Sequence, residues 1–314
     1  MAILSLGDAL TLPVASATDN VDGVLTDSII YDDSSIALYY DAISESYIIT
    51  EPGIYYIYFS VTDSSNNETL FVIKISVTET GEVVYEGYYA SIDGLSGNDL
   101  INELYNLLSS TDKKTNTYGD ARYILEESDV WVNYNTNYSY LIYTDTLKGS
   151  VSQGYPDEGP ANAIWDGGVS WNREHVWAKS LLGNGYDATN STKGIAADMH
   201  NLRAADTNVN STRNNNKFTS EVYISGGFGN YGGEWYPGDN HRGDVARILF
   251  YMDIRWGSET DLSKIGYLNT LITWHEVDPV DEFEINRNNV IYNSQGNRNP
   301  FIDHPELVNE VFVN

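Results

Sequence analysis

The side chains best suited to chemistry in this chain are histidines accompanied by acids and amides. The sequence contains no cysteine, which excludes thiol catalysis, disulfides, zinc–thiolate sites and iron–sulfur clusters. All five histidines lie after residue 174. His175 directly follows Glu174, and an amide-rich segment containing His200, Asn201 and Asn210 begins about 25 residues later.

Glutamate, histidine, asparagine and arginine, without a cluster of acids, suit the hydrolysis of a phosphodiester. A neutral histidine can deprotonate water. A carboxylate and a side-chain amide can hold one hard divalent cation and leave positions open for water and phosphate. An arginine can bind the phosphate through two parallel hydrogen bonds. A two-metal nuclease would need three or four clustered acids, and this region of the sequence does not provide them.

The spacing of Glu174 and His175 constrains where they can act together. Adjacent side chains of a β-strand point to opposite faces, so these two would share a site only where a strand ends or bends, or where a ligand lies along its edge. We expect structural roles for His241, His275 and His304. A zinc site built from histidines is discounted because no His-x-x-x-His spacing supports it.

The elements that must position these groups fall into two parts of different composition. Residues 1–86 carry 14 acids and a single base, Lys74, whereas the remaining 228 residues carry 16 bases and 31 acids. In the first part, apolar alternation predicts two strands joined by turn-forming residues 63–67. The alternating residues are Tyr55, Ile57, Phe59 and Val61, followed by Phe71, Ile73, Ile75 and Val77.

Short strands, polar turns and no helical pattern predict a β-sandwich over residues 1–80. A linker over residues 81–90 and a second domain over residues 91–314 would follow. At residues 19–23, 53–55 and 61–67 the first part resembles the immunoglobulin-like (Ig-like) repeats of bacterial surface and secreted proteins. That resemblance implies a presentation module that has no chemistry of its own and binds a surface or matrix partner.

Two helices are predicted in the second domain from the spacing of apolar residues. One follows polar cap candidates and contains Leu100, Ile101, Leu104, Leu107 and Leu108. The other begins near residue 243 and carries a stripe of Val245, Ile248, Leu249 and Met252. Strands and long loops must alternate between them, so the chain is expected to be multidomain, with an all-β sandwich followed by an α+β domain.

Motifs in the second domain resemble the bacterial endonuclease I family, and they occur in the same order from about residue 88 onward. They are Trp171-Asn172-Arg173-Glu174-His175-Val176-Trp177 and residues 198–203, 209–214, 242–247, 274–275, 278–288 and 295–305. The family consists of secreted or periplasmic nucleases with a ββα-metal (His-Me finger) active site. The resemblance implies that core here: a strand through residues 163–176, a second strand, and a helix containing Asn210.

The same resemblance implies a role for each motif residue. His175 is similar to the family's general base, which activates the attacking water. Glu174 and Asn210 resemble the two protein ligands of a single Mg²⁺-type ion, with Mn²⁺ or Ca²⁺ as alternatives, and the product would carry a 5′-phosphate. His200 and Asn201 would lie behind these groups and orient a ligand or the base. A purely structural role is the alternative for His200.

The phosphate-binding arginine is the point at which this chain departs from the family pattern. Some relatives carry that arginine in a cysteine-bearing loop between the histidine and the asparagine. The corresponding loop here, residues 182–194, contains neither arginine nor cysteine. We predict Arg213 as the first candidate and Arg203 as the second, and a structural salt bridge is the alternative for each.

The expected activity is endonucleolytic cleavage of DNA without sequence specificity, with RNA left open as a second substrate. Two other classes stay open: a non-catalytic extracellular binding protein with a degenerate nuclease domain, and a phosphodiesterase acting on small nucleotides. Metal-dependent cleavage by the pure protein separates the first of these from a nuclease.

We expect a monomer that is secreted or displayed at the cell surface. This expectation comes from the family and from the N-terminal module, since residues 1–14 contain no intact secretion signal. No membrane insertion is expected, because no stretch of about 18 apolar residues occurs.

The formal net charge of −28 would normally oppose binding to a polyanion. Residues 172–217, however, carry six bases and four acids, a local balance of +2. Salt screens charges over about 8–10 Å and would hide the distant acids from bound phosphate. We therefore predict that the cleavage rate stays flat or rises between low and moderate salt, measured on one plasmid at fixed Mg²⁺. A steep monotonic fall would contradict this prediction.

Overall fold

The computed structural model divides the chain into two compact units, Met1–Gly94 and Leu95–Asn314. It describes residues 2–19, 21–65, 68–79, 81, 83–110, 116–131, 135–144, 162–183, 186–225 and 227–313. Residues 66 and 67 of the predicted turn, residue 82 of the predicted linker and residues 184 and 185 of the loop 182–194 lie outside these ranges. Within them, no helix is both long and apolar enough to cross a membrane.

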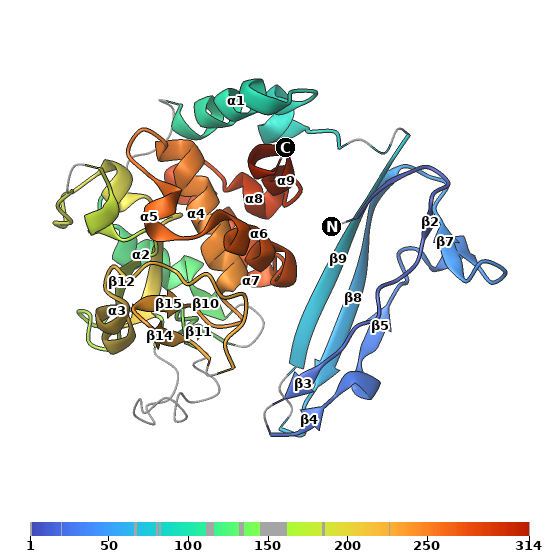
Figure 1. The fold of residues 1–314 in the computed structure, drawn as a ribbon, viewed down its shortest axis with the longest axis horizontal. Coiled ribbons are helices and arrows are strands. Elements are labelled where there is room, and N and C mark those ends of the chain that lie inside the picture. Colours follow the sequence, from blue (N-terminus) through green and yellow to red (C-terminus); the bar gives the residue numbers. More distant parts are fainter. Residues whose placement is uncertain are drawn as a thin grey trace. The chain divides into compact units, whose positions relative to one another are not determined.

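The first unit is built from β-sheets (Figure 1). Its four-stranded sheet has the order β1-β9-β8-β5, and a three-stranded sheet has the order β2-β7-β6. The strands are β1 (Ala2–Ser5), β2 (Ala9–Leu10), β3 (Thr18–Asp19), β4 (Gly23–Val24), β5 (Ile30–Asp32), β6 (Tyr40–Asp41), β7 (Ser46–Ile48), β8 (Gly53–Thr62) and β9 (Glu68–Thr78). The predicted linker contains part of a 3₁₀ turn, Gly87–Ile92.

The predicted hairpin of the first unit is confirmed by the antiparallel pairing of β8 and β9. Phe59 pairs with Phe71 and Ile57 pairs with Ile73, so the two alternating sets share one face of the sheet. That face contributes to a core whose buried members are Ile36, Tyr47, Ile49, Ile57, Phe59, Ile75 and Val77. The N-terminal part is therefore β-rich, as its alternating sequence predicts.

The second unit combines helices with short two-stranded sheets (Figure 1). Its strands are β10 (Val130–Trp131), β11 (Asn135–Ser139), β12 (Trp171–His175), β13 (Leu202–Asp206), β14 (Gly229–Tyr231) and β15 (Glu234–Tyr236). Its helices are α1 (Gly97–Ser109), α2 (Ala121–Ser128), α3 (Thr207–Arg213), α4 (Arg242–Trp256), α5 (Leu262–Ile265), α6 (Leu268–Val277), α7 (Glu282–Gln295), α8 (Pro300–Asp303) and α9 (Leu307–Phe312).

The helix predicted at the start of the second domain is confirmed as α1, with Leu100, Leu104 and Leu108 buried. The second predicted helix is α4, but its apolar stripe describes it incompletely. Every residue from 243 to 252 is buried, because α1, α6 and α8 all pack against α4. A helix enclosed in this way has no polar face to generate a stripe.

Strands β12 and β13 pair in antiparallel register, and α3 follows β13 without an intervening residue. Asp206 makes this junction possible, because it is the last residue of β13 and also the N-cap of α3. Its carboxylate accepts hydrogen bonds from the backbone N–H groups of Asn208 (2.8 Å) and Val209 (2.9 Å). The first strand is shorter than the resemblance implied, since it starts at residue 171 and not at 163.

Buried ion pairs attach the helices to this strand pair. Asp129, at the C-terminal end of α2, accepts hydrogen bonds from Arg203 of β13 (2.9 Å) and Arg287 of α7 (3.0 Å). It also accepts one from the backbone N–H of Ala204 (2.8 Å). All these side chains are buried, so each charge depends on its partner for stabilisation.

Substituting Asp129 should therefore strongly destabilise the folded chain. We predict that Asp129→Asn lowers the free energy of unfolding by roughly 3–5 kcal/mol, because buried Arg287 loses its counter-charge and buried Arg203 keeps only Asp244. Denaturant unfolding of the whole chain measures this change. Asp187→Asn, at an exposed aspartate, is the matched control and should change the free energy by less than about 0.5 kcal/mol. Equal effects of the two substitutions would contradict the prediction.

Candidate active site

The predicted catalytic pair lies where β12 ends. His175 is the last residue of that strand, which is the arrangement that lets it share a site with Glu174. Their side chains have different surroundings, as alternation along a strand requires. Glu174 contacts Tyr143 and Arg213, whereas His175 contacts the Tyr118 ring and the carbonyl of Ala196.

Glu174 is almost completely buried, with 3% of its surface exposed. Its Oε1 accepts a hydrogen bond from the Tyr143 hydroxyl (3.0 Å) and lies 3.2 Å from Nη1 of Arg213. Desolvation raises the pKa of Glu174 to about 7, although Arg213 and Tyr143 both favour the ionised form. Both of these side chains approach Oε1, so within the described part of the chain Oε2 has no side-chain partner.

The two partners of Glu174 are themselves held firmly. Arg213, at the end of α3, donates hydrogen bonds to the carbonyls of His175 (3.2 Å) and Val176 (2.6 Å). Tyr143 has a left-handed backbone, with φ of 73°, which is unfavourable for an aromatic residue. It is positioned by its neighbour Ile142, whose N–H donates to the carbonyl of Ala204 in β13 (2.9 Å).

Asn210 lies on the side of α3 that faces β12. Its amide nitrogen donates to Oδ1 of Asn172 at 2.5 Å. Asn172 is two residues before Glu174 and so lies on the same strand face. Arg213, which reaches Glu174, is one helical turn after Asn210. The bond to Asn172 fixes the amide orientation and leaves the carbonyl oxygen of Asn210 available as a ligand.

His175 is oriented through one ring nitrogen. Its Nε2 lies 2.8 Å from the Ala196 carbonyl, which can only accept a hydrogen bond, so Nε2 carries the proton and Nδ1 the lone pair. Nδ1 makes no hydrogen bond within the described residues. The ring stacks on Tyr118, with centroids 5.2 Å apart and planes 18° apart. Burial lowers the pKa of His175 to about 4, and the ring is therefore neutral at pH 7.

The donor set fits a hard divalent cation with few protein ligands. Within the described residues, a carboxylate oxygen of Glu174 and the amide oxygen of Asn210 remain without side-chain partners, and such oxygens are preferred by Mg²⁺. Among the described residues, no three His, Cys, Asp or Glu side chains gather as a larger metal site. The metal proposal therefore concerns a site in which water and substrate supply most ligands.

Neither predicted phosphate-binding arginine is accessible in this structure. Arg213 is fully buried between Glu174 and backbone carbonyls. Arg203 is fully buried as well, in ion pairs with Asp129 (2.9 Å) and Asp244 (2.8 Å). Both correspond to the alternative that the sequence allowed, a structural salt bridge, so we propose neither as a phosphate ligand.

The two residues expected behind the site lie at different places. Asn201 accepts a hydrogen bond from the backbone N–H of Trp177 (2.7 Å) and donates one to its carbonyl (3.2 Å). It therefore continues the strand pairing just beyond His175. His200 is buried against Tyr251, with centroids 4.4 Å apart, and its Nε2 lies 3.2 Å from the carbonyl of Asn297. Its partners belong to α4 and to the segment between α7 and α8.

The other histidines also have structural partners. Nε2 of His241 lies 3.3 Å from the carbonyl of Thr144, and Nε2 of His275 lies 3.1 Å from the carbonyl of Pro305. Nδ1 of His304 contacts Glu306 at 3.1 Å.

Sequence reasoning missed Tyr118, Tyr143 and Asn172. The chain contains 25 tyrosines, and no local pattern separates these two from the rest. Asn172 could have been found, because alternation along the strand places it beside Glu174.

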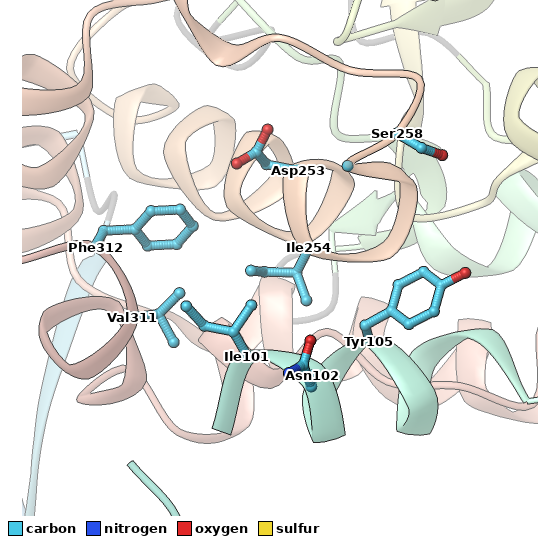
Figure 2. Close-up of a pocket in the computed structure, with 9 residues that line it drawn as sticks. Ile101, Asn102, Tyr105, Asp253, Ile254, Ser258, Val311 and Phe312 are labelled. Atoms are coloured by element: carbon cyan, nitrogen blue, oxygen red, sulfur yellow. The ribbon is translucent and has the colours of Figure 1, made fainter. Parts of the chain in front are cut away.

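A groove of about 380 Å³ lies elsewhere in the second unit (Figure 2). Figure 2 shows Ile101 and Tyr105 of α1, Ile254 of α4 and Val311 of α9 around it. Asp253 also lines this groove, and burial raises its pKa to about 6. Glu174, His175 and Asn210 are not among its lining residues, so the groove is separate from the candidate active site.

Comparison with known proteins shows the family to which the chain belongs. The family model described as Endonuclease I matches residues 96–306. An extracellular ribonuclease of Bacillus amyloliquefaciens is 35% identical over 268 residues, covering 79% of this chain and 86% of the relative. An extracellular ribonuclease of Bacillus subtilis (strain 168) is 34% identical over 244 residues, covering 72% and 78%. This chain therefore belongs to the endonuclease I family of nucleases.

Proposed function

We propose that this chain is a metal-dependent endonuclease that hydrolyses phosphodiester bonds in nucleic acids through a ββα-metal site. The observation that supports this best is the junction of β12, β13 and α3. It combines a neutral histidine that has one free ring nitrogen with a neighbouring carboxylate and amide.

His175 is the proposed general base. The bond from Nε2 to the Ala196 carbonyl fixes the tautomer, so Nδ1 can accept a proton from the attacking water. The stack on Tyr118 limits rotation of the ring and keeps Nδ1 aimed in one direction. The low pKa keeps the ring unprotonated and therefore able to act as a base at neutral pH.

Glu174 and Asn210 are the proposed ligands of one Mg²⁺-type ion. When bound, such an ion supplies positive charge at the scissile phosphate and at the departing 3′ oxygen, which leaves a 5′-phosphate. Tyr143 and Arg213 contact Oε1 of Glu174, which would leave Oε2 available to hold the ion. Asn172 accepts a hydrogen bond from the amide nitrogen of Asn210, which leaves the amide oxygen of Asn210 available to hold the ion.

The proposed substrates are RNA and DNA, cut without sequence specificity. The names of the two Bacillus relatives favour RNA. The same names favour secretion of this chain. We further propose that the first unit is an Ig-like presentation module and that the second has a His-Me finger core.

The non-catalytic binding protein is the weaker alternative. A degenerate nuclease would be expected to lose the groups that serve catalysis alone. Glu174, His175 and Asn210 are all present, and each has supporting contacts that fix its orientation.

Replacing the base tests the proposal directly. His175→Ala should lower the cleavage rate by about 10²- to 10⁴-fold, the usual effect of losing a positioned general base. The assay compares supercoiled plasmid and a structured RNA, in Mg²⁺ and in EDTA. Chelation should abolish cleavage of both substrates.

His304→Ala is the matched control, because that histidine contacts Glu306 outside the site. It should retain cleavage within about twofold of the unsubstituted chain. Cleavage that survives both His175→Ala and EDTA would show that the base and the metal requirement are wrongly assigned. No cleavage in any divalent ion would favour the binding protein.

The support for Glu174 gives a second prediction. Tyr143→Phe removes only the hydroxyl that donates to Oε1. Loss of a group that orients a metal ligand typically costs 10- to 100-fold in metal affinity or activity. We expect Mn²⁺ binding, measured by calorimetry without substrate, to weaken about 10-fold.

Tyr236→Phe provides the comparison, since that buried tyrosine donates to a different carboxylate, Asp239. It should leave Mn²⁺ affinity unchanged. Equal Mn²⁺ affinity in the Tyr143→Phe variant and the unsubstituted chain would show that the hydroxyl does not position Glu174 for metal.

A further inference from the structure

Arg173 is an unusual arginine in this chain, because no carboxylate neutralises it within the described residues. Its guanidinium is in none of the ion pairs found there. Arg122 is the other arginine in this situation. The remaining arginines each pair with an acid: Arg203, Arg213, Arg242, Arg247, Arg255, Arg287 and Arg298.

Arg173 is held by an aromatic ring in place of a carboxylate. Its Cζ lies 3.7 Å from the centroid of the Tyr118 ring, and the Trp165 ring is 5.3 Å away. Nη1 donates to the carbonyl of Tyr118 and to Oδ1 of Asn190 (3.4 Å). A ring face attracts the cation but does not cancel its charge. The guanidinium is therefore immobilised and still fully positive.

The position of Arg173 connects this charge to the candidate active site. It is two residues before His175 on β12, and residues at this spacing share a strand face. Both side chains rest on the same Tyr118 ring. Residue 173 is only partly buried, and Nη2 makes no hydrogen bond within the described part of the chain. Two N–H groups thus remain for an anion beside the base.

Nearby acids do not compete for this guanidinium. Asp120 accepts a hydrogen bond from the backbone N–H of Thr117 (2.8 Å). Glu126 accepts one from the backbone N–H of Trp165 (2.8 Å).

We propose that Arg173 binds a backbone phosphate of the nucleic acid substrate, on the His175 side of β12. This inference rests on the proposed function and assigns the arginine that Arg213 and Arg203 cannot supply. The ring of Tyr118 acts as a positioning group, because it contacts both the guanidinium and the imidazole. Phosphate binding there would hold the strand next to the base.

Substrate binding without cleavage provides the test. Fluorescence anisotropy measures the affinity for labelled single-stranded RNA and DNA 12-mers in EDTA, at an ionic strength of roughly 0.15 M. Arg173→Gln should weaken binding about 10-fold, the scale expected for losing a charge-assisted hydrogen bond to phosphate. Arg122→Gln removes the other arginine without a carboxylate partner, whose charge lies close enough to act on Arg173, and should weaken binding clearly less than Arg173→Gln does.

Arg173→Lys separates charge from geometry. It keeps the positive charge but loses the planar fork that matches phosphate. Its affinity should therefore lie between that of Arg173→Gln and that of the unsubstituted chain. Should Arg173→Gln fail to fold, a loss of about threefold in Arg173→Lys would support the proposal. Unchanged affinity in a folded Arg173 variant would overturn it.

Kinetics and stability separate phosphate binding from a purely structural role. In Mg²⁺, Arg173→Gln should raise KM about 10-fold and change kcat much less, since phosphate contact is uniform binding energy. A lower melting temperature with unchanged KM and oligonucleotide affinity would mean that Arg173 only supports the loop. Absence of cleavage by the unsubstituted chain would refute the proposed function and still leave the EDTA measurement to judge Arg173.

Discussion

The burial of the Glu174 carboxylate is the constraint on which the rest of the site depends. A charge with 3% exposure needs partners, and the chain supplies Arg213 from α3 and Tyr143 from the segment beside β13. Arg213 must reach across from the end of α3, so the helix has to pack against β12. That packing brings Asn210 over Asn172 and fixes the amide for its proposed role. Stability and ligand orientation therefore come from the same contacts.

Basic side chains are much less numerous than acidic ones in this chain. With 17 bases against 45 acids, most arginines are used inside the second unit to compensate buried carboxylates. Asp198 shows the pattern: it accepts bonds from Arg255 (2.8 Å), Trp256 (2.7 Å) and Gln295 (2.9 Å). An arginine without such a partner is therefore unusual in the described residues, and its position beside His175 makes Arg173 a candidate for binding phosphate.

The sequence predicted the parts of the fold that depend on local periodicity. The β8–β9 hairpin and helix α1 follow from alternation and from 3.6-residue spacing, and both are confirmed. Helix α4 was located by its stripe, but its burial on all sides depends on helices distant in sequence. β12 starts later than residue 163 because Asp166-Gly167-Gly168 bends the chain, and the Asp166 carboxylate accepts hydrogen bonds from the backbone N–H groups of Val169 and Ser170.

The candidate site shows the same division between local and long-range information. Motif resemblance named Glu174, His175 and Asn210. Strand alternation explains why Glu174 and His175 can share a site only where β12 ends. Three of the partners that orient them are a tyrosine before α2, a tyrosine beside β13 and a backbone carbonyl. None of these has a sequence signature. Arg213 and Arg203 illustrate the limit from the other side, since residue type alone cannot distinguish a phosphate ligand from a buried counter-ion.

The double role of Asp206 has a consequence for how this family of sequences can vary. Because that residue ends β13 and caps α3, no spacer lies between the strand and the helix. Insertion of one residue there would rotate the helix by about 100° and carry Asn210 away from β12. Among related sequences, length changes should therefore occur in the loop between β12 and β13, whereas the junction between β13 and α3 should keep a constant length.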